Sequence, residues 1–352
     1  MSAEQLISNA IPKAHPIALR SALEIALHPE HATWLHRPYL ERGAMVLMVG
    51  AEGTYKSFLA LDWAMRVAMS GEPVIFLHAE GRGLWKRLRA WCIENYPDKP
   101  WTEILNGLNF LAVERPLNLS ALTVVSALTR AIDELGKKPA LIVVDTMTRN
   151  SDGKIEKSNE DAVSYLNMID QYIRARYGAT VLLIHHIGHL ERKRARGPFS
   201  LIASTDANYL LERPDLERRI VTVTSGRMKD CEPPAAFELE AQVVALGVDD
   251  DDGKPVTSLA LRATGNTPVV ARRAPSGKAQ RQLLAELERL AALPGSVGVW
   301  PETEIRAIGR TLGMHRNTAR DASLGLRQLG YFVMTVGGSR LVHLPERMTE
   351  CT

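Results

Sequence analysis

Cysteine is scarce in this chain of 352 residues, and the three that occur are far apart. They stand at Cys92, Cys231 and Cys351, without the close spacing that cysteine ligands of a metal ion share. The pattern excludes a cysteine-based metal site and indicates a reducing compartment, where thiols stay free. We therefore expect a cytoplasmic protein.

Long apolar runs and a strong charge of one sign are also missing. No uncharged run approaches the roughly 18 residues that suggest a membrane helix, and the first residues carry no basic segment ahead of an apolar one. We expect neither a membrane span nor a secretion signal. The net charge of +3 does not by itself indicate a nucleic-acid partner. The places where basic residues cluster are more informative.

The composition, with 45% hydrophobic and 24% charged residues, is that of a globular protein. The length allows one sizeable core plus a smaller domain, or two comparable domains.

The stretch around which the chain is organised begins with an apolar run. Residues Met45–Val49 predict a fully buried strand, and apolar positions at helical spacing predict a helix over Lys56–Met69. Between them lies a loop that carries glycines. Backbone N–H groups in such a loop bind phosphate oxygens, and the helix N-terminus adds partial positive charge. This context favours a nucleotide triphosphate site over an ordinary turn before a helix.

The loop follows the motif G-x-x-x-x-G-K-[ST] with one departure. Tyr55 stands where the second glycine belongs, so a Cβ constrains the backbone there unless Gly53 supplies the flexibility. Lys56 is expected to reach the β- and γ-phosphates and Ser57 to bind Mg²⁺, which makes ATP and Mg²⁺ the expected cofactors. The residues predicted to bind the nucleotide are Gly50, Gly53, Thr54, Tyr55, Lys56, Ser57 and Phe58.

Polar side chains follow three further buried strands, which are predicted at 74–78, 139–145 and 181–186. Glu80 comes just after the first of them, Asp145 closes the second, and His185 and His186 close the third. Open α/β sheets place their ligand sites at the carboxyl ends of the strands. Asp145 has the Walker B pattern and is expected to hold Mg²⁺ opposite Ser57.

The rest of the first 264 residues predicts further elements. The list comprises helices over 84–95, 120–135 and 161–177, a strand over 108–113, a hairpin of 207–212 and 219–224, and late strands over 236–240 and 258–262. Ser120 is expected to cap its helix, residues 148–160 to form a mobile loop, and the acidic segment 249–253 to be a solvated turn.

The expected organisation is an N-terminal helical arm (1–33), an α/β domain (34–264), a linker rich in Gly and Pro (265–278) and a C-terminal domain (279–352). The helix of the arm, at 17–27, either covers its own domain or packs on a neighbouring subunit.

The C-terminal domain predicts three helices, over 279–293, 302–312 and 316–329, followed by a hairpin turned at Gly337-Gly338. This order is typical of a winged helix. Arg316, Asn317 and Arg320 begin the third helix at the spacing that directs side chains into a DNA major groove. The alternative is a module that docks proteins.

Taken together, Gly50–Ser57, Ala79-Glu80, Asp145 and His185-His186 resemble the RecA-like core of plasmid RepA-type hexameric helicases and related phage and plasmid AAA-family ATPases. The resemblance covers about residues 34–264. It implies an α/β fold with a RecA-like, mostly parallel P-loop sheet and flanking helices, to which the small winged-helix domain is added. It also implies Mg-ATP hydrolysis, assembly into a homo-oligomeric ring, a hexamer in this family, and DNA as the partner.

The resemblance also implies residue roles. Glu80 matches the carboxylate that polarises the attacking water, and His186, or His185, matches the sensor of the γ-phosphate. Arg227 and Lys229 match a basic pair that such rings offer to the neighbouring subunit's nucleotide.

The loop with Arg192, Lys193, Arg194 and Arg196 matches the one that faces single-stranded DNA in the ring channel, unless it is a solvated charge run. Tyr55, and His189 where many relatives have lysine, depart from the family.

Three functions remain open from the sequence. The first is a DNA-stimulated ATPase that serves as the replicative helicase of a plasmid, phage or integrated element. The second is an ATP-controlled DNA-binding regulator or replication initiator that does not unwind DNA. The third, for which only Tyr55 argues, is a nucleotide-binding scaffold with impaired turnover.

Overall fold

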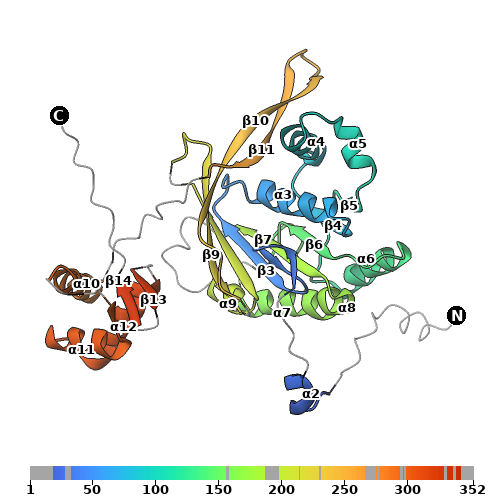
Figure 1. Cartoon of the computed structure of the whole chain (residues 1–352). Coiled ribbons are helices and arrows are strands. Elements are labelled where there is room, and N and C mark those ends of the chain that lie inside the picture. The colour runs from blue at the N-terminus through green and yellow to red at the C-terminus, as the bar shows by residue number, and fades with distance from the viewer. Residues whose placement is uncertain are drawn as a thin grey trace, which may run out of the picture. The chain divides into compact units, whose positions relative to one another are not determined.

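The computed structural model describes residues 19–27, 33–155, 158–186, 198–213, 215–229, 231–265, 275, 277–293, 296, 299–328, 331–335 and 338–341. The chain divides into two compact units, residues 1–268 and 269–352 (Figure 1). The predicted DNA-facing loop at 192–196 and His189 lie outside the described residues, as do most of the arm and of the linker.

One nine-stranded sheet forms the centre of the first unit, in the order β11-β10-β9-β8-β3-β7-β6-β4-β5. The strands from β8 to β5 in this order are parallel, and β9, β10 and β11 extend the sheet in antiparallel fashion. The fold is therefore α/β with a mostly parallel sheet, which confirms the predicted fold class. The parallel strands are β3 (Met45–Gly50), β4 (Val74–His78), β5 (Phe110–Val113), β6 (Leu141–Asp145), β7 (Thr180–His186) and β8 (Ala207–Glu212). The antiparallel strands are β9 (Ile220–Met228), β10 (Phe237–Asp249) and β11 (Pro255–Ala263).

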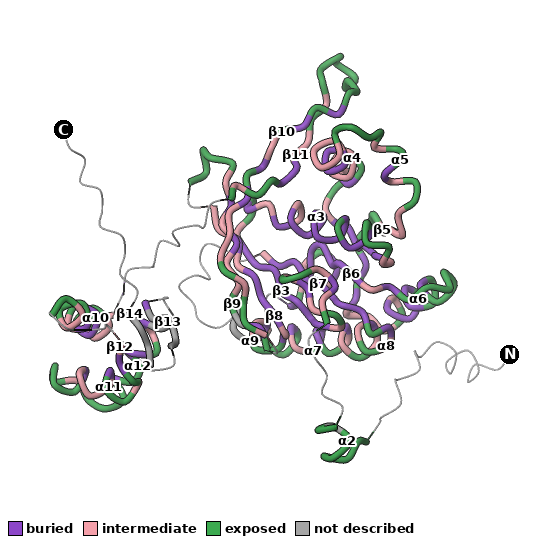
Figure 2. Tube along the Cα trace, in the orientation of Figure 1, coloured by how far each residue is buried: buried purple, intermediate pink, exposed green. Residues whose placement is uncertain are grey.

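The central strands are buried on both faces because helices cover the sheet from either side (Figures 1 and 2). This is why their sequences are unbroken apolar runs rather than alternating ones. Helices α3 (Lys56–Met69), α4 (Leu84–Asn95) and α5 (Trp101–Asn106) lie on one face. The other face carries α6 (Leu122–Glu134), α7 (Asn159–Ile169), a π-helix (Asp170–Arg174), α8 (Ala175–Tyr177) and α9 (Pro198–Ala203). Each face has its own apolar core, centred on residues such as Trp63 and Tyr165.

Several predicted elements need correction. Ser120 does not cap a helix, because α6 begins at Leu122 with Ala121 as the N-cap and no side-chain cap. The strand expected at 236–240 continues to Asp249, since β10 pairs with β11 far beyond the last residue that it pairs with β9. The resulting hairpin packs on α4 through a small cluster that includes Ala90 and Leu246. Elements that were not predicted are β1 (Trp34–His36), β2 (Leu40–Glu41), α5, α9 and β12 (Val299–Trp300).

The helix expected over 17–27 is observed as α2 (Ala22–Leu27). The apolar residues Leu19, Leu23 and Leu27 of this segment are 94%, 67% and 64% exposed, so they are not covered by any described part of the chain. Among the described helices, none is both long and apolar enough to cross a membrane.

The second unit contains α10 (Lys278–Ala291), β12, α11 (Glu302–Thr311), α12 (Arg316–Gln328), β13 (Phe332–Thr335) and β14 (Gly338–Leu341). Its three strands pair antiparallel in the order β12-β14-β13. The apolar faces of the three helices meet in one core, to which Leu283, Leu287, Trp300, Ile305 and Leu326 contribute. Gly309 lets α11 approach α12 closely, because a Cβ there would lie 2.8 Å from that of Ala319.

Gly50, the last residue of β3, is expected to tolerate no side chain. A Cβ there would lie 2.6 Å from the Leu211 carbonyl oxygen and 2.7 Å from Thr54 Oγ1. We expect Gly50→Ala to lower the free energy of unfolding by about 1–3 kcal/mol, the usual cost of overpacking, in urea titrations. Gly107→Ala is the matched control, because a Cβ at Gly107 meets nothing within 4 Å. Equal stability of the two variants would contradict the prediction.

Candidate active site

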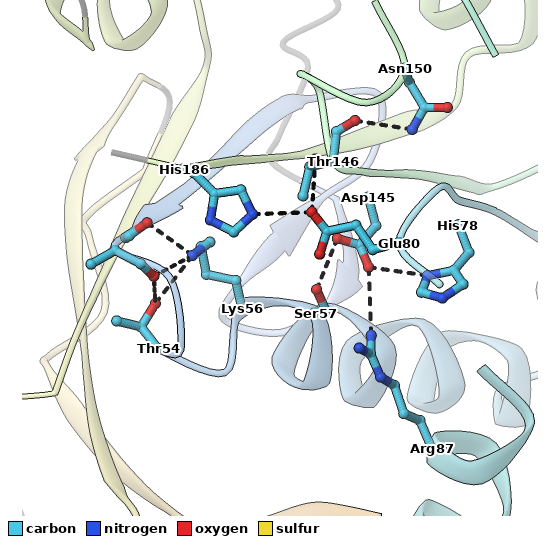
Figure 3. A network of polar contacts seen from close by, with 12 residues as sticks. Thr54, Lys56, Ser57, His78, Glu80, Arg87, Asp145, Thr146, Asn150 and His186 are labelled. Atoms are coloured by element: carbon cyan, nitrogen blue, oxygen red, sulfur yellow. Dashed lines mark hydrogen bonds and ion pairs between the residues drawn. The ribbon is translucent and has the colours of Figure 1, made fainter. Parts of the chain in front are cut away.

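Four parallel strands bring the candidate residues to one edge of the sheet. Gly50 pairs with His186, and His78 pairs with Asp145, so the carboxyl ends of β3, β7, β4 and β6 are aligned. The loop 50–57 after β3, called the P-loop here, lies beside Glu80, Asp145 and His186 (Figure 3). A cavity of ≈ 260 Å³ opens at this edge. It is lined by Glu52, Gly53, Thr54, Tyr55, Lys56, Ser57, Phe58, Glu80, Arg87 and His186.

The side chain of Lys56 is buried and folds back on the P-loop residues that precede it. Its ammonium lies 2.9 Å from the Gly50 carbonyl oxygen, 2.6 Å from that of Ala51 and 3.3 Å from Thr54 Oγ1 (Figure 3). Burial lowers the pKa of Lys56 to about 8, although the charges of Glu80 and Asp145 act in the opposite direction. The cation is therefore held by carbonyl dipoles in a site that lacks a full counter-charge.

Tyr55 adopts the backbone conformation that the motif normally reserves for glycine. Its φ and ψ are 60° and 21°, in the left-handed region, which costs a residue with a Cβ roughly 1–2 kcal/mol. The predicted constraint at this position is thus real, but the loop keeps its shape. The Tyr55 ring packs edge-on against Phe58, with ring centres 6.1 Å apart, and the guanidinium of Arg213 lies 4.7 Å from its centre.

Ser57 lines the cavity and contacts the buried Asp145 behind it. The Ser57 hydroxyl donates to Asp145 Oδ1 over 2.9 Å. The fully buried Asp145 Oδ2 accepts no hydrogen bond; His78 Nδ1 lies 3.5 Å and Arg87 Nη1 3.8 Å away from it. The Asp145–Thr146 peptide bond is cis.

This pair fits Mg²⁺. A hydroxyl and a carboxylate with one orphaned oxygen are hard oxygen donors, and Mg²⁺ takes one or two such ligands together with phosphates and water. Among the described residues no group of three or more His, Cys, Asp or Glu side chains could hold a metal ion by itself. A metal here would therefore depend on the nucleotide for its remaining ligands.

Glu80 is held as a carboxylate. Its Oε1 lies 3.2 Å from His186 Nε2 and accepts a hydrogen bond from the Thr146 hydroxyl over 3.3 Å (Figure 3). The hydrogen bond from His186 lowers the pKa of Glu80 below its usual value, more than partial burial raises it. His186 makes this contact, whereas His185 is one residue earlier on β7 and is buried.

Three groups at the site were not predicted from the sequence. Arg87, on the basic helix α4, approaches Asp145 and places its guanidinium 4.7 Å from the centre of the Phe58 ring. Thr146 follows the Walker B aspartate, and Arg213 follows β8. The basic face of α4 was visible in the sequence, but nothing there showed that Arg87 faces the strand ends.

The predicted basic pair is at the end of β9, with Arg227 inside the strand and Lys229 directly after it. Met228, at the end of β9, pairs with Ala207, at the start of β8. Lys229 binds Asp206, with Nζ 2.7 Å from Oδ1, and the same carboxylate accepts from the backbone N–H of Met45. Lys229 is thus at the amino ends of the parallel strands, at the edge of the sheet opposite to the P-loop.

In the second unit, the predicted DNA-binding residues Arg316, Asn317 and Arg320 lie together at the start of α12. They line a cavity of ≈ 350 Å³ with Thr303, Arg306 and Arg310 of α11.

A P-loop, a buried lysine and a Ser–Asp pair at the carboxyl edge of a parallel sheet define a P-loop ATPase-type domain. A family model described as "AAA domain" matches residues 13–192, just over half of the chain. The chain belongs to this AAA domain family. No curated protein sequence matches the chain.

Solved structures that are similar to it include the following two. One is described by its title as an ATPase domain, with 15% identity and a TM-score of 0.47 over 62% of this chain and 91% of that one. The other is titled "The Structure Of A DnaB-Like Replicative Helicase And Its Interactions With Primase", with 14% identity, a TM-score of 0.47 and 57% of each chain covered. The present chain thus spans a little over half of that helicase's length. With both TM-scores below 0.5, neither structure says what this chain acts on.

The buried Lys56 predicts a proton-coupled ligand affinity. With a pKa of about 8, Lys56 is mostly deprotonated at pH 9, and a bound triphosphate raises its pKa. Binding at pH 9 must then take up a proton, so the dissociation constant rises above pH 8 by up to about tenfold per unit. Below pH 7 this group contributes no dependence.

Calorimetry of ATP binding in buffers of different ionisation enthalpy measures this uptake. We expect the proton uptake to be much larger at pH 9 than at pH 7. In the control variant Lys99→Ala, which removes an exposed lysine, the uptake at each pH should equal that of the wild type. Equal proton uptake at both pH values would show that Lys56 does not titrate in this range.

Proposed function

We propose that this chain is a Mg-dependent ATP hydrolase that works as a ring-forming DNA motor, the replicative helicase of a plasmid, phage or integrated element. The observation that carries the hydrolase assignment is the position of Glu80. The Glu80 carboxylate, which His186 and Thr146 hold and whose pKa the His186 hydrogen bond lowers, shares one cavity with Lys56 and Ser57, and Ser57 is hydrogen-bonded to Asp145. AAA domain family membership supports the same conclusion.

Each group has a role that follows from its chemistry. Lys56 supplies the charge directed at the β- and γ-phosphates, and the P-loop N–H groups bind their oxygens. Ser57 and Asp145 would hold Mg²⁺, and the ion would supply positive charge next to the phosphates. Glu80 orients the attacking water and accepts its proton. His186, through its hydrogen bond to Glu80, reports whether the γ-phosphate is present.

We propose that Lys229 and Arg227 act on the nucleotide of a neighbouring copy. Lys229 supports this, because it lies at the edge of the sheet opposite to its own P-loop and reaches a nucleotide only if that nucleotide is bound by another copy. Such a contact is head-to-tail, and it closes into a ring when the rotation permits. Single-stranded DNA then passes through the ring, with the basic residues at 192–196 along its channel.

Lys56→Ala and Glu80→Gln are expected to separate binding from turnover. Lys56→Ala should weaken ATP binding and abolish hydrolysis, because it removes a charge that faces the phosphates. Glu80→Gln should still bind ATP but lose on the order of 10² or more in turnover, the scale of general-base assistance. Phosphate release and binding of a fluorescent ATP analogue measure the two effects.

Glu114→Gln is the control for Glu80. Glu114 is an exposed carboxylate directly after β5, at the same sheet edge, and its loss should leave turnover near that of the wild type. If Glu80→Gln hydrolyses ATP at the wild-type rate, the role of Glu80 is wrong. The motor itself is tested by hydrolysis with and without single-stranded DNA and by ATP-dependent strand displacement.

A second candidate function is an ATP-controlled DNA-binding regulator or replication initiator. The arginine cluster of the second unit favours it, since four arginines of α11 and α12 line one cavity. We propose that this unit is a winged helix, with α12 as the helix that enters a major groove of duplex DNA. The two functions differ in whether a particular duplex sequence or single-stranded DNA binds more tightly.

Removing Arg316 and Arg320 tests this proposal. The double variant Arg316→Ala, Arg320→Ala should bind duplex DNA more weakly and bind ATP unchanged. For every phosphate that the variant no longer neutralises, the slope of log affinity against log salt should fall by about 0.9. Arg289→Ala is the control, because Arg289 pairs with Glu286 on α10. An unchanged slope in the double variant would show that these arginines do not contact DNA phosphates.

A further inference from the structure

Arg213, the residue after β8, forms hydrogen bonds with two separate parts of the chain. Its Nη1 donates to the Gly53 carbonyl oxygen in the P-loop over 3.1 Å. Its Nη2 donates to the carbonyl oxygens of Leu216 and Arg218, over 2.7 Å and 2.9 Å, in the turn that leads to β9. The turn therefore fixes the plane of the guanidinium, and the guanidinium in turn contacts the P-loop.

The same guanidinium covers the ring of Tyr55. The guanidinium carbon (Cζ) of Arg213 lies 4.7 Å from the ring centre, within the range of a cation–π contact. Tyr55 is the only described non-glycine residue with a positive φ. The two groups that Arg213 contacts on the P-loop thus flank the backbone of residues 53–55, where the loop departs from its sequence motif.

We propose that Arg213 is a positioning residue for the P-loop, which holds Tyr55 in the left-handed conformation that the motif otherwise obtains from glycine. The inference rests on the proposed function in one respect, namely that the P-loop binds a nucleoside triphosphate. Without Arg213, Tyr55 relaxes toward negative φ, and the N–H groups of residues 53–57 lose their alignment. Only the fraction of molecules that keeps the loop conformation then binds.

A double-mutant cycle on Arg213 and Tyr55 tests the proposal. Arg213→Ala should weaken binding of a fluorescent ATP analogue on the order of tenfold, the loss expected if about one molecule in ten keeps the competent loop. Tyr55→Gly provides the reference background, because glycine adopts positive φ freely and does not need Arg213 to hold it there. In the Tyr55→Gly background, Arg213→Ala should cost much less. This non-additivity is the signature of a shared contact.

Two further variants separate charge from geometry. Arg218→Ala is the matched control, because it removes an arginine of the same turn whose side chain is 75% exposed and keeps the carbonyl that Arg213 uses. It should bind ATP like the wild type. Arg213→Lys keeps the charge without the planar fork and should restore only part of the affinity. Thermal melting of each variant confirms that it is folded.

Hydrogen exchange of the amides at 53–57 in nucleotide-free protein distinguishes the two ways of failing. Arg213→Ala should accelerate this exchange, and Tyr55→Gly should abolish the difference. If the wild type binds no ATP but exchange responds as stated, the proposed function fails and the positioning role stands. If Arg213→Ala binds ATP as tightly as the wild type, or costs the same factor in both backgrounds, the positioning role is overturned.

Discussion

The parallel alignment of β4, β6, β7 and β3 is the constraint on which the rest of the first unit depends. Pairing of His78 with Asp145 and of Gly50 with His186 fixes the level at which each strand ends. A shift of one residue would turn Asp145 to the other face of the sheet and separate it from Ser57. The helices on both faces bury these strands, and burial holds the register.

Two charged groups at this edge are buried, and each is compensated locally. Three oxygens of the P-loop surround the ammonium of Lys56, and Ser57, His78 and Arg87 surround Asp145. Burying a charge without such partners is very costly. The compensation is incomplete, since Asp145 Oδ2 accepts no hydrogen bond and the pKa of Lys56 is lowered to about 8. These are the two places where a metal ion and a phosphate group would complete the site.

The environment of Tyr55 explains how a departure from the motif is tolerated. A glycine would adopt positive φ without cost, whereas tyrosine needs other contacts to hold it there. Phe58 and Arg213 provide these contacts. The guanidinium of Arg87, which approaches Asp145, also packs on the Phe58 ring. Arg213, Tyr55, Phe58 and Arg87 thus form a continuous series of contacts from the β8–β9 turn to Asp145. The backbone conformation at Tyr55 thus depends on Arg213, which is more than 150 positions away in the sequence.

Local patterns in the sequence were enough to predict the strands and helices that surround the site, because unbroken apolar runs such as Val74–His78 and the helical spacing over Lys56–Met69 are local signals. The same patterns placed Glu80, Asp145 and the pair His185-His186 at strand ends, and the structure shows that His186 is the one that contacts Glu80. The course of β10 past its hydrogen bonds to β9, the position of Lys229 at the opposite edge, and the contacts of Arg87 and Arg213 with P-loop side chains became visible only in the folded chain. These outcomes depend on pairing and packing between distant segments, for which no single stretch of residues carries a pattern.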